Sequence, residues 1–394
     1  MTRLDLGAAL REAHLADPAA IPAVVARAAA QFGATDVVVY LVDFAQTTLE
    51  PIPDGQAHAD LPVSEEVAAT MAGRAFVDQH VTVAERQGGA RVWVPIVEGS
   101  DRTGVLAMDL PEATDEVLAA CRDLGLLTGH LIATQARVTD LYNLHRRRRA
   151  LSLAASMQWD LLPPLVLKTS RLTVAALVEP AYEVGGDCFD YAVNGAQLSL
   201  AIMDAVGHGV ASALIAALAI GVYRRDRREG RSLEHTHRDL DETLAAQLTS
   251  HAFATGQLLQ IDLDTGTATW TNAGHPLPLL IRGGRVVAEL QCPPTVPWGL
   301  GAIDGLRRGV HVASVALEPG DALLLYTDGV TEAHRTGEEH FGLDRLADLA
   351  GQHASDHVEP EEIIRRIVGA VLEHQEHLAD DATLVLVRWH GPPS

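Results

Sequence analysis

Short apolar runs separated by polar turns fill the chain from about residue 172 to residue 389. Short runs that alternate or are wholly apolar are typical of strands, and longer segments with apolar residues three or four apart are typical of helices. The expected strands are 174–178, 199–203, 252–262, 267–272, 277–282, 311–317, 322–326 and 383–389, and the expected helices are 211–225, 233–249, 343–351 and 360–374. Strands that come in runs and helices that come in pairs indicate an α+β fold.

A second pattern, over residues 21–112, predicts a mixed α/β module. The expected elements are a helix over 22–32, a strand over 37–42, a turn over 51–55, a helix over 64–72, and strands over 91–97 and 103–109 around a polar hairpin. Pro22 is tolerated in the first turn of its helix. This order of elements, with the apolar run 104–108 following a Val-Pro-Ile strand, resembles a GAF sensory domain. The resemblance implies a small-molecule or protein signal at this module.

The segment from residue 115 to residue 162 predicts one continuous helix that ends at Pro163 and Pro164. Its apolar stripe follows alternating steps of three and four, the a/d spacing of a coiled coil. The stripe consists of Leu124, Leu127, Leu131, Thr134, Val138 and Leu141. It predicts a parallel seam in a homodimer, and the alternative is that it packs the helix on its own sheet. The expected domains are therefore a GAF-like sensor over 1–114, a helical linker over 115–164 and a C-terminal domain over 165–394.

Composition narrows the classes of partner and location. The formal net charge of −22 argues against nucleic acid or an anionic membrane as the main partner, because both require basic surface. We expect no membrane span, since no apolar stretch approaches the ~20 residues that cross a bilayer. Three isolated cysteines, Cys121, Cys188 and Cys292, indicate reduced thiols. Together with an N-terminus that lacks a signal pattern, they predict a cytoplasmic protein.

Four short acidic motifs carry the candidate chemistry. They are Gly185-Gly186-Asp187, Asp204-Ala205-Val206-Gly207-His208-Gly209, Thr327-Asp328-Gly329 and Asp380-Asp381-Ala382-Thr383. In three of them the aspartate stands at the edge of an apolar run, and carboxylates at strand ends can converge on Mg²⁺ or Mn²⁺, which prefer oxygen ligands.

Taken singly, each of these motifs has a plainer interpretation as a turn, because glycine allows positive φ and aspartate caps its own backbone. A purely structural interpretation gives no reason for Asp190 near Asp187 or for Asp380 beside Asp381. Paired carboxylates repel each other unless a cation lies between them.

Together with two further segments, these motifs resemble the SpoIIE/RsbU branch of the metal-dependent serine/threonine protein phosphatases, the type 2C superfamily (PPM). The resemblance extends over about residues 172–388. It rests on Glu-Val-Gly-Gly-Asp-Cys-Phe-Asp at 183–190, the motif at 204–209, Thr-Asn-Ala-Gly-His-Pro at 271–276, Tyr-Thr-Asp-Gly-Val-Thr-Glu at 326–332 and Asp-Asp-Ala-Thr-Leu at 380–384. It implies a β-sandwich flanked by helices, with a metal site at one end of the sheets.

The resemblance also implies roles for individual residues. Asp204 bridges two Mn²⁺ or Mg²⁺ ions, and the carbonyl of Ala205 adds a backbone ligand. Asp328 and Asp380 complete the shell of one ion, with Asp381 the less favoured of its pair. Asp187 holds the waters of the other ion, so Asp187 and Asp204 are the expected catalytic residues. The remaining motif residues are Gly186, Asp190, Gly207, His208, Asn272, His275 and Gly329.

The chain departs from the wider superfamily at two positions. Relatives outside this branch have a glutamate before the first aspartate and a histidine two residues after the bridging one, where this chain has Gly186 and Val206. His208 lies two residues further on, and we assign it no general-acid role. His275 is expected to order a turn beside the core. The leaving-group acid and the arginine that grips the phosphate stay unassigned.

The expected function is metal-dependent hydrolysis of phosphoserine or phosphothreonine on a regulatory protein, under control of the sensor domain. By resemblance, that substrate is a phosphorylated anti-sigma-factor antagonist on a separate chain. A catalytically degenerate phosphatase-like scaffold is the alternative, and retention of all four motif aspartates argues against it. A nuclease that uses the same metals is a third hypothesis, which the charge of −22 disfavours.

Overall fold

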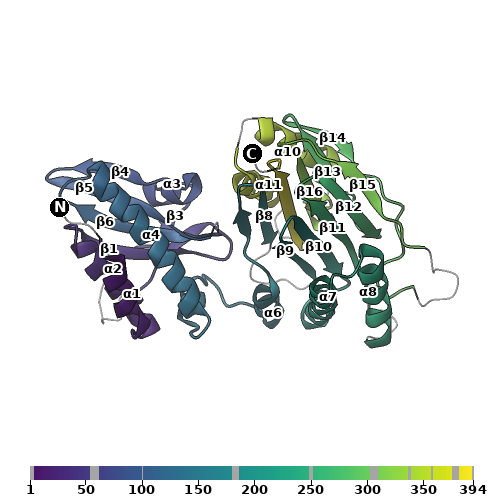
Figure 1. The fold of residues 1–394 in the computed structure, drawn as a ribbon, viewed down its shortest axis with the longest axis horizontal. Helices are drawn as coiled ribbons and strands as arrows, with labels where there is room; N and C mark the ends of the chain where they lie inside the picture. Colours follow the sequence, from purple (N-terminus) through teal and green to yellow (C-terminus); the bar gives the residue numbers. More distant parts are fainter. Residues whose placement is uncertain are drawn as a thin grey trace. The chain divides into compact units, whose positions relative to one another are not determined.

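The computed structural model describes residues 4–53, 62–99, 101–179, 186–247, 252–301, 309–335, 339–355, 358–374 and 381–392. The chain divides into two compact units, residues 1–150 and 151–394. Each unit has its own sheets and cores and is described by itself (Figure 1).

The first unit is one antiparallel sheet of six strands, in the order β3-β2-β1-β6-β5-β4, with helices on both faces. The strands are β1 (Thr35–Val42), β2 (Thr48–Pro51), β3 (Glu65–Glu66), β4 (Thr82–Arg86), β5 (Gly89–Glu98) and β6 (Asp101–Leu110). The helices are α1 (Leu6–His14), the 3₁₀ turn η1 (Pro18–Ala20), α2 (Ile21–Ala30), α3 (Met71–Asp78), α4 (Asp115–Ala136) and α5 (Leu141–His145). One core lies between the sheet and α1, α2 and α4, and a smaller one lies under α3.

The helix expected over 64–72 is wrong, because residues 65 and 66 pair with β2 and the helix begins only at Met71. Thr70 caps α3 by accepting a hydrogen bond from the Gly73 amide. This N-cap fixes the start of the helix at Met71. The strands expected over 37–42, 91–97 and 103–109 are confirmed as β1, β5 and β6.

The continuous linker helix is also wrong. Helix α4 ends at Ala136, α5 covers only Leu141–His145, and α6 starts at Leu153. Glycines bring α4 close to its own sheet, since a Cβ on Gly125 would lie 2.6 Å from the Pro95 carbonyl oxygen and one on Gly129 2.1 Å from that of Val97.

The apolar stripe on α4 therefore serves the first unit's own core. Leu124, Leu127 and Leu131 are buried there, whereas Val138, beyond the helix end, is 75% exposed. Among the described residues α4 is also the one helix long and apolar enough to cross a membrane by length and composition, so the expectation that no stretch approaches that length was too strong. The same composition suits a helix buried on one side against a sheet.

The second unit is a β-sandwich with helices outside each sheet (Figure 1). One antiparallel sheet has the order β15-β12-β11-β10-β9 and the other β14-β13-β16-β17-β8-β7. The strands are β7 (Val166–Lys168), β8 (Leu172–Glu179), β9 (Asp187–Asn194), β10 (Gln197–Ala205), β11 (Ala254–Asp262), β12 (Thr267–Ala273), β13 (Leu279–Arg282), β14 (Arg285–Glu289), β15 (Ala313–Ala316), β16 (Ala322–Tyr326) and β17 (Ala382–Trp389). The helices are α6 (Leu153–Leu161), α7 (Val210–Arg228), α8 (Leu233–Gln247), α9 (Asp328–Thr331), α10 (Leu343–Ser355) and α11 (Pro360–His374).

Three cores hold the layers of this unit together. The central core fills the space between the sheets, α7 and α8 pack on the five-stranded sheet, and α10 and α11 pack on the six-stranded one. All eight strands and four helices expected here are present; β16 and α11 have the expected ends, and the ends of the others differ from the expected ones. Strand β9 is not expected from the sequence, because Asp187 and Asp190 interrupt its apolar pattern, yet it carries the first motif.

Candidate metal centre

Strand pairing places the first two motif aspartates side by side. Strands β9 and β10 form a hairpin in which Asp187 is the register partner of Asp204. Asp187 opens β9 and is 2% exposed, and Asp204 lies near the end of β10 and is half-buried. Antiparallel register therefore brings together two carboxylates that are 17 residues apart in sequence.

Asp381 joins this pair from the opposite sheet, where it immediately precedes β17. Its Oδ2 accepts hydrogen bonds from the backbone amide of Gly186 at 2.8 Å and from that of Asp187 at 3.3 Å. The residue treated as the less favoured of its pair thus sits in the cluster, and Asp380 lies outside the described residues.

Thr327 links the two sheets at the same point. Its fully buried hydroxyl donates to Oδ2 of Asp187 at 2.6 Å and accepts from the amide of Thr383 at 2.9 Å. Asp328 follows directly, as the first residue of α9. The end of β16 and the start of β17 therefore bring the third and fourth motifs to the first.

Two glycines make this close approach sterically feasible. A Cβ on Gly186 would lie 2.5 Å from the carbonyl oxygen of Ala205 and 3.3 Å from Oδ1 of Asp204. A Cβ on Gly329 would lie 1.9 Å from the carbonyl oxygen of Asp381. Any larger residue at either position would push apart the segments that carry the carboxylates.

The electrostatics of the cluster call for a cation. Burial raises the pKa of Asp187 well above its ordinary value, and the carboxylates of Asp204 and Asp381 raise that pKa further, against the hydrogen bond from Thr327. A divalent cation among these groups would favour their ionised forms. Because the donors are carboxylate oxygens with a backbone carbonyl at Ala205 beside them, they fit a hard ion such as Mg²⁺ or Mn²⁺.

Asp190 has a structural role, contrary to the expectation that only a cation would explain it. It lies three residues along β9 from Asp187, which places it on the opposite face of the strand. There its 1%-exposed carboxylate accepts from Arg224 at 3.0 Å and from Arg227 at 2.6 Å, both on α7. Asp190 therefore ties the sheet to α7 and belongs to the packing of the domain.

The loop after β10 leads directly into α7. Gly207 and Gly209 have φ values of 90° and 78°, which favour glycine, and Gly209 is the N-cap residue of the helix. His208 between them is solvent-exposed.

Asn272 and His275 form a buried turn behind the cluster. The Asn272 side chain accepts from the His275 amide and donates to the His275 carbonyl, both at 2.8 Å. The His275 ring lies 2.9 Å from the hydroxyl of Thr255, the register partner of Asp204. Burial lowers the pKa of His275 to about 3, so its ring is neutral and supports the strand behind Asp204.

Sequence reasoning assigned no role to three residues that position the cluster. Thr327 and Thr383 stand inside the third and fourth motifs, and a hydroxyl close to an aspartate in each motif could have suggested supporting hydrogen bonds to the carboxylates. Gln158 on α6 donates from its side-chain amide to the Asp187 carbonyl and is 3% exposed. Nothing in its local sequence marks it, because its partner is 29 residues away.

Comparisons with known proteins show the family of the second unit. The chain matches the family model for stage II sporulation protein E (SpoIIE) over residues 194–390, half of its 394 residues. It is 24% identical over 240 residues to phosphoserine phosphatase RsbU of Bacillus subtilis (strain 168), covering 60% of this chain and 69% of RsbU. It is 25% identical over 249 residues to phosphoserine phosphatase RsbP of the same organism, covering 61% of this chain and 58% of RsbP.

The chain is also similar to a solved structure of an RsbU domain. The RsbU and RsbW domains of Rv1364c from Mycobacterium tuberculosis are 27% identical, with a TM-score of 0.50 over 57% of this chain and 63% of that one. The second unit of this chain has the helix-flanked sandwich and, at one end of its sheets, the aspartate cluster. Together they define a phosphatase domain of the metal-dependent type 2C class. The chain belongs to the SpoIIE family, and its second unit is a SpoIIE/RsbU-type phosphatase domain.

Proposed function

We propose that the second unit hydrolyses phosphoserine or phosphothreonine in a protein substrate with the help of two divalent cations, Mn²⁺ or Mg²⁺. The observation that carries this proposal is the convergence of Asp187, Asp204 and Asp381 on one buried, oxygen-lined point. A degenerate scaffold would have no use for carboxylates held this closely at the expense of a raised pKa on Asp187.

Each residue of the cluster has a distinct part in the proposed site. By family resemblance, Asp204 would contact both ions, Asp328 and Asp380 would complete the shell of one ion, and Asp187 would hold the waters of the other. Thr327 holds the carboxylate of Asp187 in one orientation. When bound, the ions lower the pKa of a water, place it for in-line attack on phosphorus and neutralise the developing charge.

By family resemblance, the proposed substrate is a phosphorylated anti-sigma-factor antagonist. The net charge of −22 agrees with a protein rather than a nucleic-acid substrate. The nuclease hypothesis finds no support in the comparisons, which return phosphoserine phosphatases. A cytoplasmic location and a homodimer stay predictions. The apolar stripe on α4 does not serve as the seam of that homodimer, because it is buried in the core of its own unit.

We further propose that the first unit is a GAF-like sensor for a small-molecule or protein signal and acts through α6, which begins three residues after residue 150. Gln158 on α6 donates to the carbonyl of Asp187, and the Leu161 carbonyl accepts from Arg224 of α7. Displacement of α6 would therefore disturb the backbone of Asp187, which carries one of the cluster carboxylates. Gln158→Ala should change the Mn²⁺ dependence of turnover, whereas Asp160→Ala on the exposed side of α6 should not.

The catalytic proposal is tested by Asp204→Ala in the full chain. We expect turnover of a phosphoserine protein with Mn²⁺ to fall by more than about 100-fold, since even supporting residues around a metal contribute roughly 10- to 100-fold. The control is Asp348→Ala, an exposed aspartate on α10. Full activity in Asp204→Ala, or in the unaltered protein with excess chelator, would overturn the metal-hydrolase assignment.

A further inference from the structure

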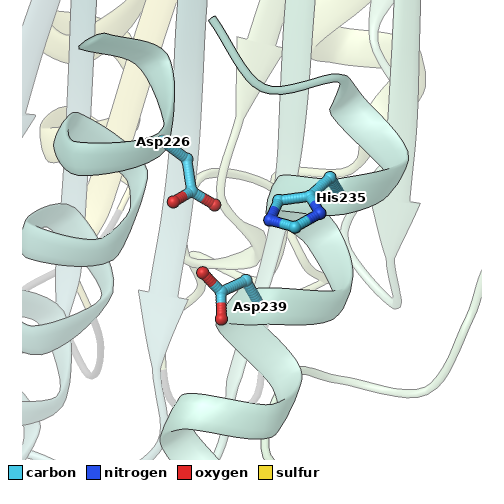
Figure 2. A group of neighbouring side chains, drawn as sticks. All are labelled: Asp226, His235 and Asp239. Carbon is cyan, nitrogen blue, oxygen red and sulfur yellow. The ribbon is translucent and has the colours of Figure 1, made fainter. Parts of the chain in front are cut away.

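A second group of potential metal ligands lies outside the carboxylate cluster, where α7 ends and α8 begins. It consists of Asp226, His235 and Asp239, and one ligand atom from each lies within 4.8 Å of the others. His235 and Asp239 are four residues apart on α8 and so project from the same face of the helix. Figure 2 shows the three side chains directed toward one another from the two helices.

This group is remote from the proposed phosphatase centre. Strand β10 ends at Ala205, α7 starts five residues later at Val210, and Asp226 lies sixteen residues further along the helix. At 1.5 Å per residue, about 24 Å of helix separate the two places. The ligands of one site therefore have no part in the other.

The buried carboxylate of Asp226 is the independent observation that points to a ligand. Its side chain is 1% exposed, and its Oδ1 accepts from Nε of the neighbouring Arg225 at 3.0 Å. Its Oδ2 is buried and has no hydrogen-bond partner among the residues that the structure describes. A buried carboxylate oxygen without a donor or a cation is costly, and Figure 2 shows this carboxylate facing His235 and Asp239.

Arg225 satisfies the group only in part. Its guanidinium bonds Oδ1 of Asp226 and Oδ2 of Asp239, which shows that the two carboxylates lie close enough to share one cation. The Arg225 side chain is 50% exposed, so it can leave toward solvent at little cost. Even with Arg225 in place, Oδ2 of Asp226 lacks a hydrogen-bond partner in the described part of the chain.

We propose that Asp226, His235 and Asp239 bind a first-row transition-metal ion of the Zn²⁺ type that fastens α7 to α8. An imidazole with two carboxylates suits Zn²⁺ better than Mg²⁺, which prefers oxygen donors throughout. Donors around a tetrahedral Zn²⁺ lie roughly 3.3 Å apart at bond lengths near 2.0–2.1 Å. Rotation of the exposed His235 and release of Asp239 by Arg225 would close the 4.8 Å group to that size.

The test is a Zn²⁺ titration of the full chain in a large excess of Mg²⁺, which occupies oxygen-only sites. The unaltered protein should bind one more equivalent of Zn²⁺ than His235→Ala, or bind it roughly tenfold or more tightly. The control is His311→Ala, an exposed histidine outside the group. Because His235 is exposed, its substitution should leave the fold intact. Asp226→Asn alters a second proposed ligand and keeps nearly the same side-chain shape.

Co²⁺ supplies a spectroscopic readout that phosphatase activity does not affect. A tetrahedral site with an imidazole gives an intense visible spectrum, which should appear with the unaltered protein and with Asp204→Ala but be lost in His235→Ala. Identical Zn²⁺ stoichiometry, affinity and Co²⁺ spectrum in the unaltered protein and His235→Ala would overturn the proposal. Loss of turnover in Asp204→Ala with this spectrum retained would separate the two metal sites.

Discussion

Replacing Thr327 with valine tests how the sandwich positions its carboxylates. The two side chains have nearly the same shape, so the substitution removes a hydroxyl without opening a cavity. That hydroxyl donates to Oδ2 of Asp187 at 2.6 Å and accepts from the Thr383 amide at 2.9 Å, and Thr327 is completely buried.

The size of the effect follows from these two hydrogen bonds. A hydrogen bond to a charged group contributes about 1.5–3 kcal/mol, and a buried amide left without a partner costs about 1–3 kcal/mol. Thr327→Val should therefore lower the free energy of unfolding by about 2.5–6 kcal/mol. Because Asp187 loses the group that orients it, the Mn²⁺ concentration for half-maximal activity should rise roughly 10- to 100-fold.

Two measurements check this prediction in the full chain. Urea denaturation in excess chelator gives the metal-independent stability, and turnover of a phosphoserine protein against Mn²⁺ concentration gives the metal dependence. Thr327→Ser, which keeps the hydroxyl, is the matched control and should retain most of both properties. If Thr327→Val matches Thr327→Ser in stability and in Mn²⁺ dependence, the hydroxyl does not position Asp187.

Four further changes test other parts of the structure. Asp190→Ala should destabilise the second unit by about 3–5 kcal/mol in urea, because it leaves two arginines without their buried partner; a Mn²⁺-binding defect with normal stability would contradict its structural role. Burial lowers the pKa of His237 to about 4, below the 6.5 of the unfolded chain, so up to about 3 kcal/mol of stability present above pH 6.5 should be lost on acidification toward pH 4; His237→Gln should flatten that dependence, and an unchanged slope would refute it. Leu127→Glu with Leu131→Glu should unfold the first unit, seen by proteolysis, rather than dissociate a folded dimer into folded monomers. Gly329→Ala should reduce turnover through the clash with Asp381, and full activity would show that the peptide can move aside.

Much of the second unit could be predicted from the sequence because strands there are short and strongly apolar. Runs such as 322–326 are buried throughout, so their period and length indicate strands without knowledge of their neighbours. Strand β9 escaped this reasoning because its two aspartates serve different faces, one in the cluster and one against α7. The polar residues that interrupt the pattern are the functional and structural ones.

The first unit shows the limit of periodicity as a signal. A stripe with steps of three and four fits both a coiled-coil seam and a helix packed on a sheet. The close approach of Gly125 and Gly129 to β5 decides between them, and it depends on contacts with residues about 30 positions away. The helix over 64–72 fails for a similar reason, because pairing with β2 outweighs local propensity.

The sequence by itself determined the set of candidate aspartates and the α+β class, because apolar periodicity and turn chemistry are local properties. Tertiary structure decided which aspartates meet. The register of β9 with β10 sets Asp187 beside Asp204, and the packing of two sheets brings Asp381 and Thr327 to them across about 140–195 residues. Tertiary structure also pairs Asp190 with Arg227 of α7 and brings Asp226 of α7 close to His235 and Asp239 of α8. A pattern states which face of an element is apolar, and only the folded chain states what covers that face.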